Sequence, residues 1–174
     1  LYEYAKHVDT LSVCFSKGLG APFGSMLMGK KEIIEKARRF KVWLGSGFHQ
    51  IGICASAALY ALQNNILSLK TDHELAQLFV ERLLSVAEVT IDPRPIETNI
   101  VQFSIAGLGY SQEDFLSQCR DKGMLLFPWL PTKVRAVVHR PLNEKDINTA
   151  IHIIKDVVRR ITSQQKVKRY AKSL

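Results

Sequence analysis

The stretch CFSKGLGAPFGSMLMG, Cys14–Gly29, places a single lysine between two apolar runs. Lys17 is followed at once by Gly-Leu-Gly-Ala-Pro, and the glycines and the proline predict a tight turn just beyond it. A lysine that ends a buried strand costs free energy unless something uses its amine. Two interpretations are therefore open: a hairpin tip with a solvated lysine, or an amine presented to chemistry.

The composition is that of a globular protein with a hydrophobic core. The chain has 174 residues, of which 47% are hydrophobic, enough for one large domain or two small ones. Its longest apolar segment begins at Ile51 and is too short to span a bilayer. We therefore expect a buried helix there and no membrane partner.

The three cysteines, Cys14, Cys54 and Cys119, are far apart and set among apolar neighbours. An odd number of dispersed cysteines is typical of reduced, buried thiols in a reducing compartment, so we expect a cytoplasmic protein. His7, His73 and His152 have no cysteine, histidine or carboxylate partner at ligand spacing, and we expect no metal site.

The net charge of +8 is concentrated in two places. Residues 159–174 hold six basic residues and no acidic one, and residues 30–41 hold six basic and two acidic residues. A basic tail is able to bind phosphate backbones, but it is more often a solvated helix end. We therefore expect no nucleic-acid partner.

Strand-like and helix-like segments alternate along the chain, which predicts an α/β fold. A boundary near residues 66–71 divides the chain into a domain of residues 1–66, with too little sheet to close a core alone, and a domain of residues 67–174. Helix N-caps are expected at Asp72, Ser111 and Asn143, a helix stop at Gly123, and a break at 92–95. The expected strands are 10–15, 23–29, 89–91, 99–105, 124–127 and 134–139, and the expected helices are 31–44, 50–63, 72–87, 111–123 and 143–161.

The surroundings of Lys17 favour chemistry over a plain turn. An amine held between an apolar strand and a glycine loop loses part of the solvation that stabilises its ammonium form, and it becomes more nucleophilic. Such an amine is what a carbonyl cofactor needs to form an imine. The hydroxyls of Ser12, Ser16 and Ser25 are available to a phosphate group. We expect Lys17 at the end of a buried strand, at the mouth of a cavity.

The longer sequence around this lysine resembles the threonine aldolases. The matching segments are DTLSVCFSKGLGAPFGSMLMG (9–29), LGSGFHQIGICASAALYAL (44–62), TNIV (98–101) and VRAVVH (134–139). These enzymes are lyases that depend on pyridoxal phosphate and have the fold that aspartate aminotransferase typifies. The resemblance implies the C-terminal portion of that fold: a remnant of the large, cofactor-binding domain over 1–66, and the small α/β domain with a basic tail over 67–174.

The resemblance also implies roles for individual residues. Lys17 corresponds to the catalytic lysine that forms the Schiff base with the cofactor, and Ser16 beside it is expected to contact the cofactor. His49 stands where the family has an arginine that helps to hold the phosphate, so phosphate binding is expected to be weaker. Ser46 replaces a family glycine, and Val42 stands at a usually basic position.

Arg135 is similar to the arginine that binds the α-carboxylate of the substrate, a task that suits its planar, two-pronged guanidinium. From the residues alone, an edge-strand arginine in an ion pair is the alternative interpretation.

For the intact protein, the resemblance implies cleavage of β-hydroxy-α-amino acids, with threonine or allo-threonine giving glycine and acetaldehyde in amino-acid metabolism. The alternatives are an aminotransferase or a β-eliminating lyase of the same fold, and a truncated, divergent, non-catalytic relative. The family's partner for the pyridine nitrogen and its glycine-rich phosphate loop lie far upstream of the lysine, whereas only sixteen residues precede Lys17 here. We therefore expect the chain alone to be inactive, and the intact protein to be a homo-oligomer, a dimer or tetramer, with an amino-acid substrate.

Overall fold

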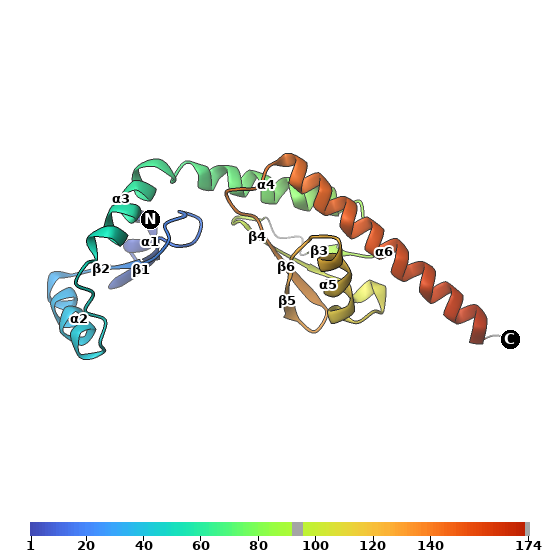
Figure 1. Cartoon of the computed structure of the whole chain (residues 1–174), viewed down its shortest axis with the longest axis horizontal. Coiled ribbons are helices and arrows are strands. Elements are labelled where there is room, and N and C mark those ends of the chain that lie inside the picture. Colours follow the sequence, from blue (N-terminus) through green and yellow to red (C-terminus); the bar gives the residue numbers. More distant parts are fainter. Residues whose placement is uncertain (92–95, 173–174) are drawn as a thin grey trace. The chain divides into compact units, whose positions relative to one another are not determined.

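The computed structural model describes residues 1–91 and 96–172, except for the side chains of residues 167–172 (Figure 1). The chain divides into two compact units, Leu1–Leu69 and Lys70–Leu174. The break expected at 92–95 falls outside the described residues, as do three of the six basic side chains of the tail. Within the described part, no helix is both long enough and apolar enough to cross a membrane.

The first unit contains one antiparallel hairpin and two longer helices. Its strands pair from Thr10 opposite Gly29 to Cys14 opposite Ser25, so the lysine loop is the hairpin connection. Its small core joins residues of this loop to one helix and consists of Phe15, Leu19, Ala21, Ala58 and Ala61. The elements are α1 (Tyr2–Ala5), β1 (Thr10–Cys14), β2 (Ser25–Gly29), α2 (Lys31–Trp43) and α3 (Gly52–Asn64).

Two expectations about burial in this unit are wrong. Strand β1 is not fully buried, because its residues alternate between exposed and half-buried and β2 is its only strand neighbour. Helix α3 buries only Ala58 and Ala61, and Ile53 is 78% exposed. Large apolar side chains of this unit are exposed: at the end of α2, Trp43 and Leu44 are 76% and 80% exposed.

The second unit is a four-stranded antiparallel sheet with helices packed on one face. The strand order is β3-β4-β6-β5, so β6 lies inside the sheet and β5 at an edge. The elements are α4 (Ser68–Leu83), which begins two residues before the unit, β3 (Thr90–Ile91), β4 (Ile100–Ser104), the 3₁₀ turn η1 (Ala106–Leu108), α5 (Gln112–Asp121), β5 (Phe127–Leu130), β6 (Lys133–Val137) and α6 (Glu144–Lys172).

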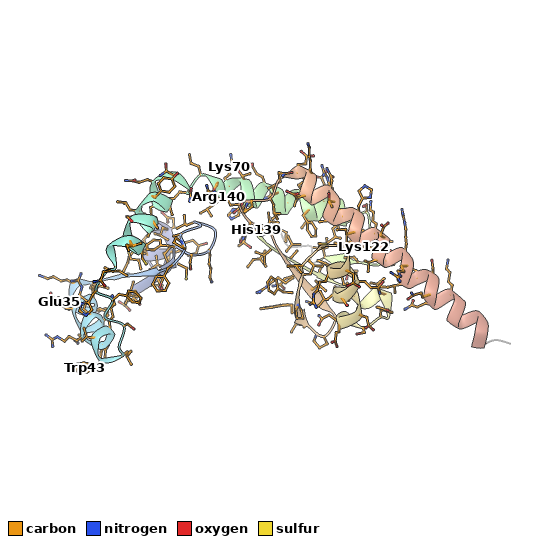
Figure 2. All side chains as sticks on the ribbon, in the orientation of Figure 1. Glu35, Trp43, Lys70, Lys122, His139 and Arg140 are labelled. Carbon is orange, nitrogen blue, oxygen red and sulfur yellow. The ribbon has the colours of Figure 1, made fainter. Side chains whose placement is uncertain are left out.

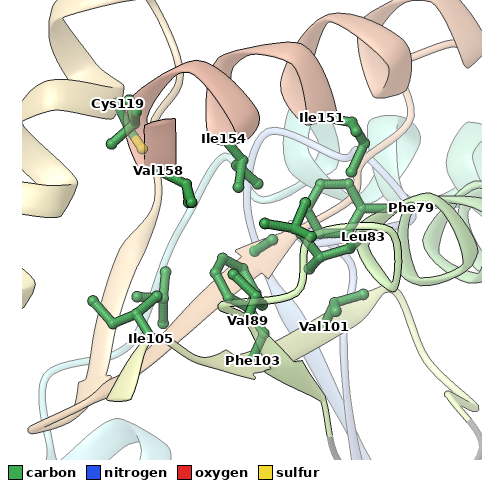
Figure 3. Close-up of a cluster of buried hydrophobic side chains, with 14 of the residues drawn as sticks. Phe79, Leu83, Val89, Val101, Phe103, Ile105, Cys119, Ile151, Ile154 and Val158 are labelled. Carbon is green, nitrogen blue, oxygen red and sulfur yellow. The ribbon is translucent and has the colours of Figure 1, made fainter. Parts of the chain in front are cut away.

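The core of the second unit lies between that sheet and its helices (Figure 3). Alternate residues of the central strands point into it, and two of them, Phe103 and Val134, are at most 1% exposed. Helix α4 contributes Phe79, α5 contributes Cys119 and α6 contributes Ile154. The residues between them on β4 and β6 face the opposite side of the sheet.

Three helix boundaries follow their expected caps. The Ser111 hydroxyl accepts a hydrogen bond from the Asp114 amide at 3.4 Å. Asn143 and Asp146 cap the start of α6 reciprocally, because each side chain accepts a hydrogen bond from the other's backbone amide. Gly123, at φ +86°, ends α5 in the left-handed conformation that favours glycine.

Two local expectations are wrong. Asp72 is not a helix cap: α4 begins at Ser68, directly after a turn held by the buried amide of Asn65, which donates to the Leu19 carbonyl at 2.7 Å. The strand expected at 124–127 lies instead at Phe127–Leu130. Its position is set by the tight turn to β6, which pairs Leu130 with Lys133.

Candidate active site

Lys17 lies in the connection between β1 and β2, three residues beyond the strand end. The connection is shaped by backbone hydrogen bonds, including Gly20 N–H to the Lys17 carbonyl at 2.8 Å and Ala21 N–H to the Phe15 carbonyl at 2.9 Å. Phe15, Leu19 and Ala21 turn inward to the small core. Ser16 and Lys17, which lie between these buried positions, are exposed.

The expectation that Lys17 is desolvated at the end of a buried strand is wrong for the chain as described. The Lys17 side chain is exposed. It makes no hydrogen bond or ion pair with any residue that the structure describes. The hairpin has only two strands, and no further layer of the described first unit covers the lysine. Its amine is therefore free and solvated.

Ser16, the residue before the lysine, lines a hollow of about 730 Å³ between the hairpin, the end of α2 and the start of α3. Its lining combines hydroxyl groups, one cation and aromatic rings. The rings of Phe23 and Phe48 lie 6.0 Å apart between centroids. The polar lining residues are Ser16, Ser25, Lys41 and Ser46, and two of the three cysteines, Cys14 and Cys54, also line it.

The expected cofactor contacts differ in their relation to this hollow. Ser16 lines it, whereas Lys17 and His49 are each next in sequence to a lining residue and do not line it themselves. His49 is exposed in the segment between α2 and α3. Of the three expected residues, only Ser16 lines the hollow, and Lys17 and His49 adjoin lining residues in the sequence.

Arg135 lies on β6 in the second unit, on the sheet face opposite the helices. Its guanidinium carbon is 5.2 Å from the ring centroid of Phe127 and 5.1 Å from that of Trp129. Its Nε is buried and has no hydrogen-bond partner. An edge-strand ion pair is therefore wrong on both counts: β6 is an internal strand, and Arg135 has no acidic partner among the described residues.

Sequence reasoning missed the two aromatic partners of Arg135. They occur two residues apart on one strand, and a period of two places both side chains on one face. The spacing was visible in FPWL, but its relation to Arg135 depends on the pairing of β5 with β6.

Sequence reasoning also missed a buried acid in the second unit. Asp72 is 2% exposed, and its Oδ2 has no partner among the described residues. Burial raises the pKa of the Asp72 carboxyl above its ordinary value, and the positive charges of His139, His73 and Arg140 act against that rise. His139 and Arg140 follow the end of β6 (Figure 2). The polarity of this group was visible in the sequence, but its burial was not.

The structure resembles known enzymes that share one fold. A structure described as an L-allo-threonine aldolase from Listeria monocytogenes superposes with a TM-score of 0.69 at 19% identity, over 89% of this chain and 46% of that one. A structure described as a transaminase with L-alanine superposes with a TM-score of 0.65 at 11% identity, over 94% and 43%. The expected α/β fold, that of the aspartate-aminotransferase-like enzymes, is confirmed.

The sequence points to one family. The chain is 34% identical over 149 residues to low-specificity L-threonine aldolase 1 of Arabidopsis thaliana. The aligned region covers 85% of this chain and 42% of that protein. The chain spans about 40% of the length of the two low-specificity threonine aldolases of Arabidopsis thaliana that it matches. The expected resemblance to threonine aldolases is confirmed. Residues 1–106, more than half of the chain, match the family model described as beta-eliminating lyase, and the chain therefore belongs to that family.

Proposed function

We propose that the intact protein is a pyridoxal-phosphate-dependent lyase that cleaves β-hydroxy-α-amino acids such as threonine or allo-threonine into glycine and an aldehyde. One observation carries the proposal. Lys17, whose amine is exposed, lies in the segment that matches the family and directly follows Ser16 in the sequence. Ser16 lines a hollow that also contains hydroxyl, cationic and aromatic groups.

The residues of this hollow fit a phosphorylated aromatic cofactor. Hydroxyl groups and the ammonium of Lys41 suit a phosphate, and the rings of Phe23 and Phe48 suit an aromatic face. Lys17 would hold the cofactor covalently through its amine, with Ser16 and His49 as further contacts. When bound, the cofactor supplies the electron sink for breaking a carbon–carbon bond.

Arg135 would bind the substrate carboxylate. Its guanidinium has no acid to neutralise it among the described residues, and it lies on a sheet face that the helices do not cover. A planar fork receives a carboxylate through two parallel hydrogen bonds, which also fixes the orientation of the substrate.

Further assignments follow from the same proposal. Residues 1–66 would belong to the large, cofactor-binding domain, and residues 67–174 would form the small domain. We propose a homo-oligomer, since much apolar side-chain surface of the first unit is exposed. The free thiols suit a cytoplasmic protein that acts in threonine breakdown and glycine formation.

A second candidate is a non-catalytic relative of the threonine aldolases. It is favoured by the exposure of Lys17, by His49 in place of an arginine, and by Val42 at a usually basic position. A protein of this kind would bind the cofactor weakly or without preference for Lys17.

The experiment that separates the two candidates labels the lysine. The full chain is titrated with pyridoxal phosphate, reduced with borohydride and digested, and the modified lysines are identified by mass spectrometry. We expect Lys17 to be modified first, because its side chain is exposed and has no partner among the described residues, and because Ser16 directly before it lines the hollow. Lys17→Ala should remove the cofactor adduct of this lysine. The control is Lys31, an exposed lysine at the start of α2, and Lys31→Ala should leave the adduct on Lys17 unchanged. Equal modification of many exposed lysines would refute the proposal.

A further inference from the structure

Strand β5 carries an irregularity just beyond the position that pairs with Arg135. Phe127 pairs with Arg135 and Pro128 with Val134, but the next pair is Leu130 with Lys133. Trp129 is therefore the extra residue of a β-bulge, a feature that redirects a side chain. Pro128 has no N–H to donate, which suits an edge strand.

The bulge is held in place from a neighbouring helix. The side-chain amide of Gln112, the first residue of α5, donates to the carbonyl of Leu130 at 2.6 Å and to that of Lys133 at 2.5 Å. These carbonyls flank the turn between β5 and β6. The turn, and with it the place of Trp129, is thus fixed by α5.

The two rings of β5 determine which side of the guanidinium is open. Both centroids lie within 5.2 Å of the Arg135 guanidinium carbon, a distance typical of a cation over an aromatic face. Of the three guanidinium nitrogens, only Nε is both buried and without a hydrogen-bond partner. A ligand that approaches from solvent therefore meets the two Nη groups.

We propose that Phe127 and Trp129 are positioning residues, which hold Arg135 so that a carboxylate binds end-on to its two Nη groups. This inference rests on the proposed role of Arg135 as the carboxylate-binding residue. An aromatic face restrains a guanidinium without neutralising it, whereas an acidic partner would compete with the ligand. The rings also shield part of the guanidinium from water, which strengthens its hydrogen bonds to a carboxylate.

The test measures carboxylate binding by the full chain without the cofactor. Saturation-transfer NMR compares L-threonine with L-threoninamide, in which an uncharged carboxamide replaces the carboxylate. Trp129→Leu should weaken the binding of L-threonine about three- to tenfold, the range that the loss of one such stack predicts. Trp129→Phe keeps an aromatic face and should stay within about twofold of the wild type. Arg135→Lys keeps the charge but loses the two-pronged contact, so it should reduce the preference for threonine over threoninamide.

A second readout separates positioning from general stability. The NMR resonance of the Arg135 side-chain Nε–H should be shifted by the two rings in the wild type, and this shift should shrink in Trp129→Leu. Threonine should perturb the Nη resonances more than the Nε resonance. Where Trp129→Leu fails to fold, Phe127→Leu provides the same comparison.

The outcomes distinguish this inference from the proposed function. Wild-type affinity in folded Trp129→Leu and Phe127→Leu would overturn the inference alone. A wild type that does not prefer threonine to threoninamide would overturn both this inference and the proposed role of Arg135. Dependence of threonine binding on Trp129, together with no preference of pyridoxal phosphate for Lys17, would support the inference and overturn the proposed cofactor site.

Discussion

Replacing Asp72 by asparagine should stabilise the second unit at neutral pH. Asp72 lies inside α4, is 2% exposed, and has one carboxylate oxygen without a partner among the described residues. A buried polar atom without a hydrogen bond costs about 1–3 kcal/mol, and more when it is charged. Asparagine keeps the shape and removes the charge, so we expect the free energy of unfolding to rise by about 1 kcal/mol.

The pH dependence of this effect follows from the direction of the pKa shift. Burial raises the pKa of Asp72 above its unfolded value of 3.8, so the folded state binds a proton more tightly than the unfolded state. The free energy of unfolding of the wild type therefore falls as the pH rises from 3.8 through the folded pKa. The advantage of Asp72→Asn should be largest at neutral pH and should disappear as the pH is lowered toward 3.8.

The assay is urea unfolding over a series of pH values. The chain has two tryptophans, Trp43 and Trp129, so the Trp43→Phe background leaves Trp129 as a fluorescent reporter within the second unit. Glu81→Gln is the matched control, because Glu81 is exposed on the same helix. A variant Asp72→Asn that is less stable than the wild type at pH 7 would refute the reasoning. It would mean that the histidines and Arg140 outweigh burial.

Two further predictions concern thiols and close packing. Cys14 is exposed and should react with iodoacetamide in the native chain. Burial raises the pKa of the Cys119 thiol to about 12, so Cys119 should react only after the chain unfolds. Labelling of Cys119 in the native chain would contradict its burial. A methyl group at Gly107 would lie 2.8 Å from the Glu88 carbonyl oxygen, so Gly107→Ala should lower the free energy of unfolding by about 1–3 kcal/mol. Gly52→Ala is the control: nothing lies within 4 Å of its added methyl group, so it should leave the free energy of unfolding unchanged or raise it. Equal melting temperatures of Gly107→Ala and Gly52→Ala would contradict the expected clash at Gly107.

The local pattern of the sequence was enough to predict the longer helices and most of the strands in their order. Hydrophobic periodicity located α2 and α6, and the caps at Ser111 and Asn143 were correct because a cap depends on a side chain and an amide only a few residues apart. The motif around Lys17 likewise identified the family, since its residues are contiguous in the chain.

What the sequence could not determine was burial and pairing, which depend on residues far away in the chain. Whether Lys17 is desolvated depends on the layers that cover β1, and in the described structure the amine is exposed. Asp72 looked like an exposed cap but lies inside a helix that faces β6 and α6 across a shared core. For Arg135, the residues alone left an ion pair open beside the carboxylate-binding role that the resemblance implies. Only the register of β5 against β6, with its bulge at Trp129, brings two aromatic rings to the guanidinium. Local signals predict elements because their interactions are short in sequence, whereas the environment of each functional side chain is set by contacts that only the folded chain creates.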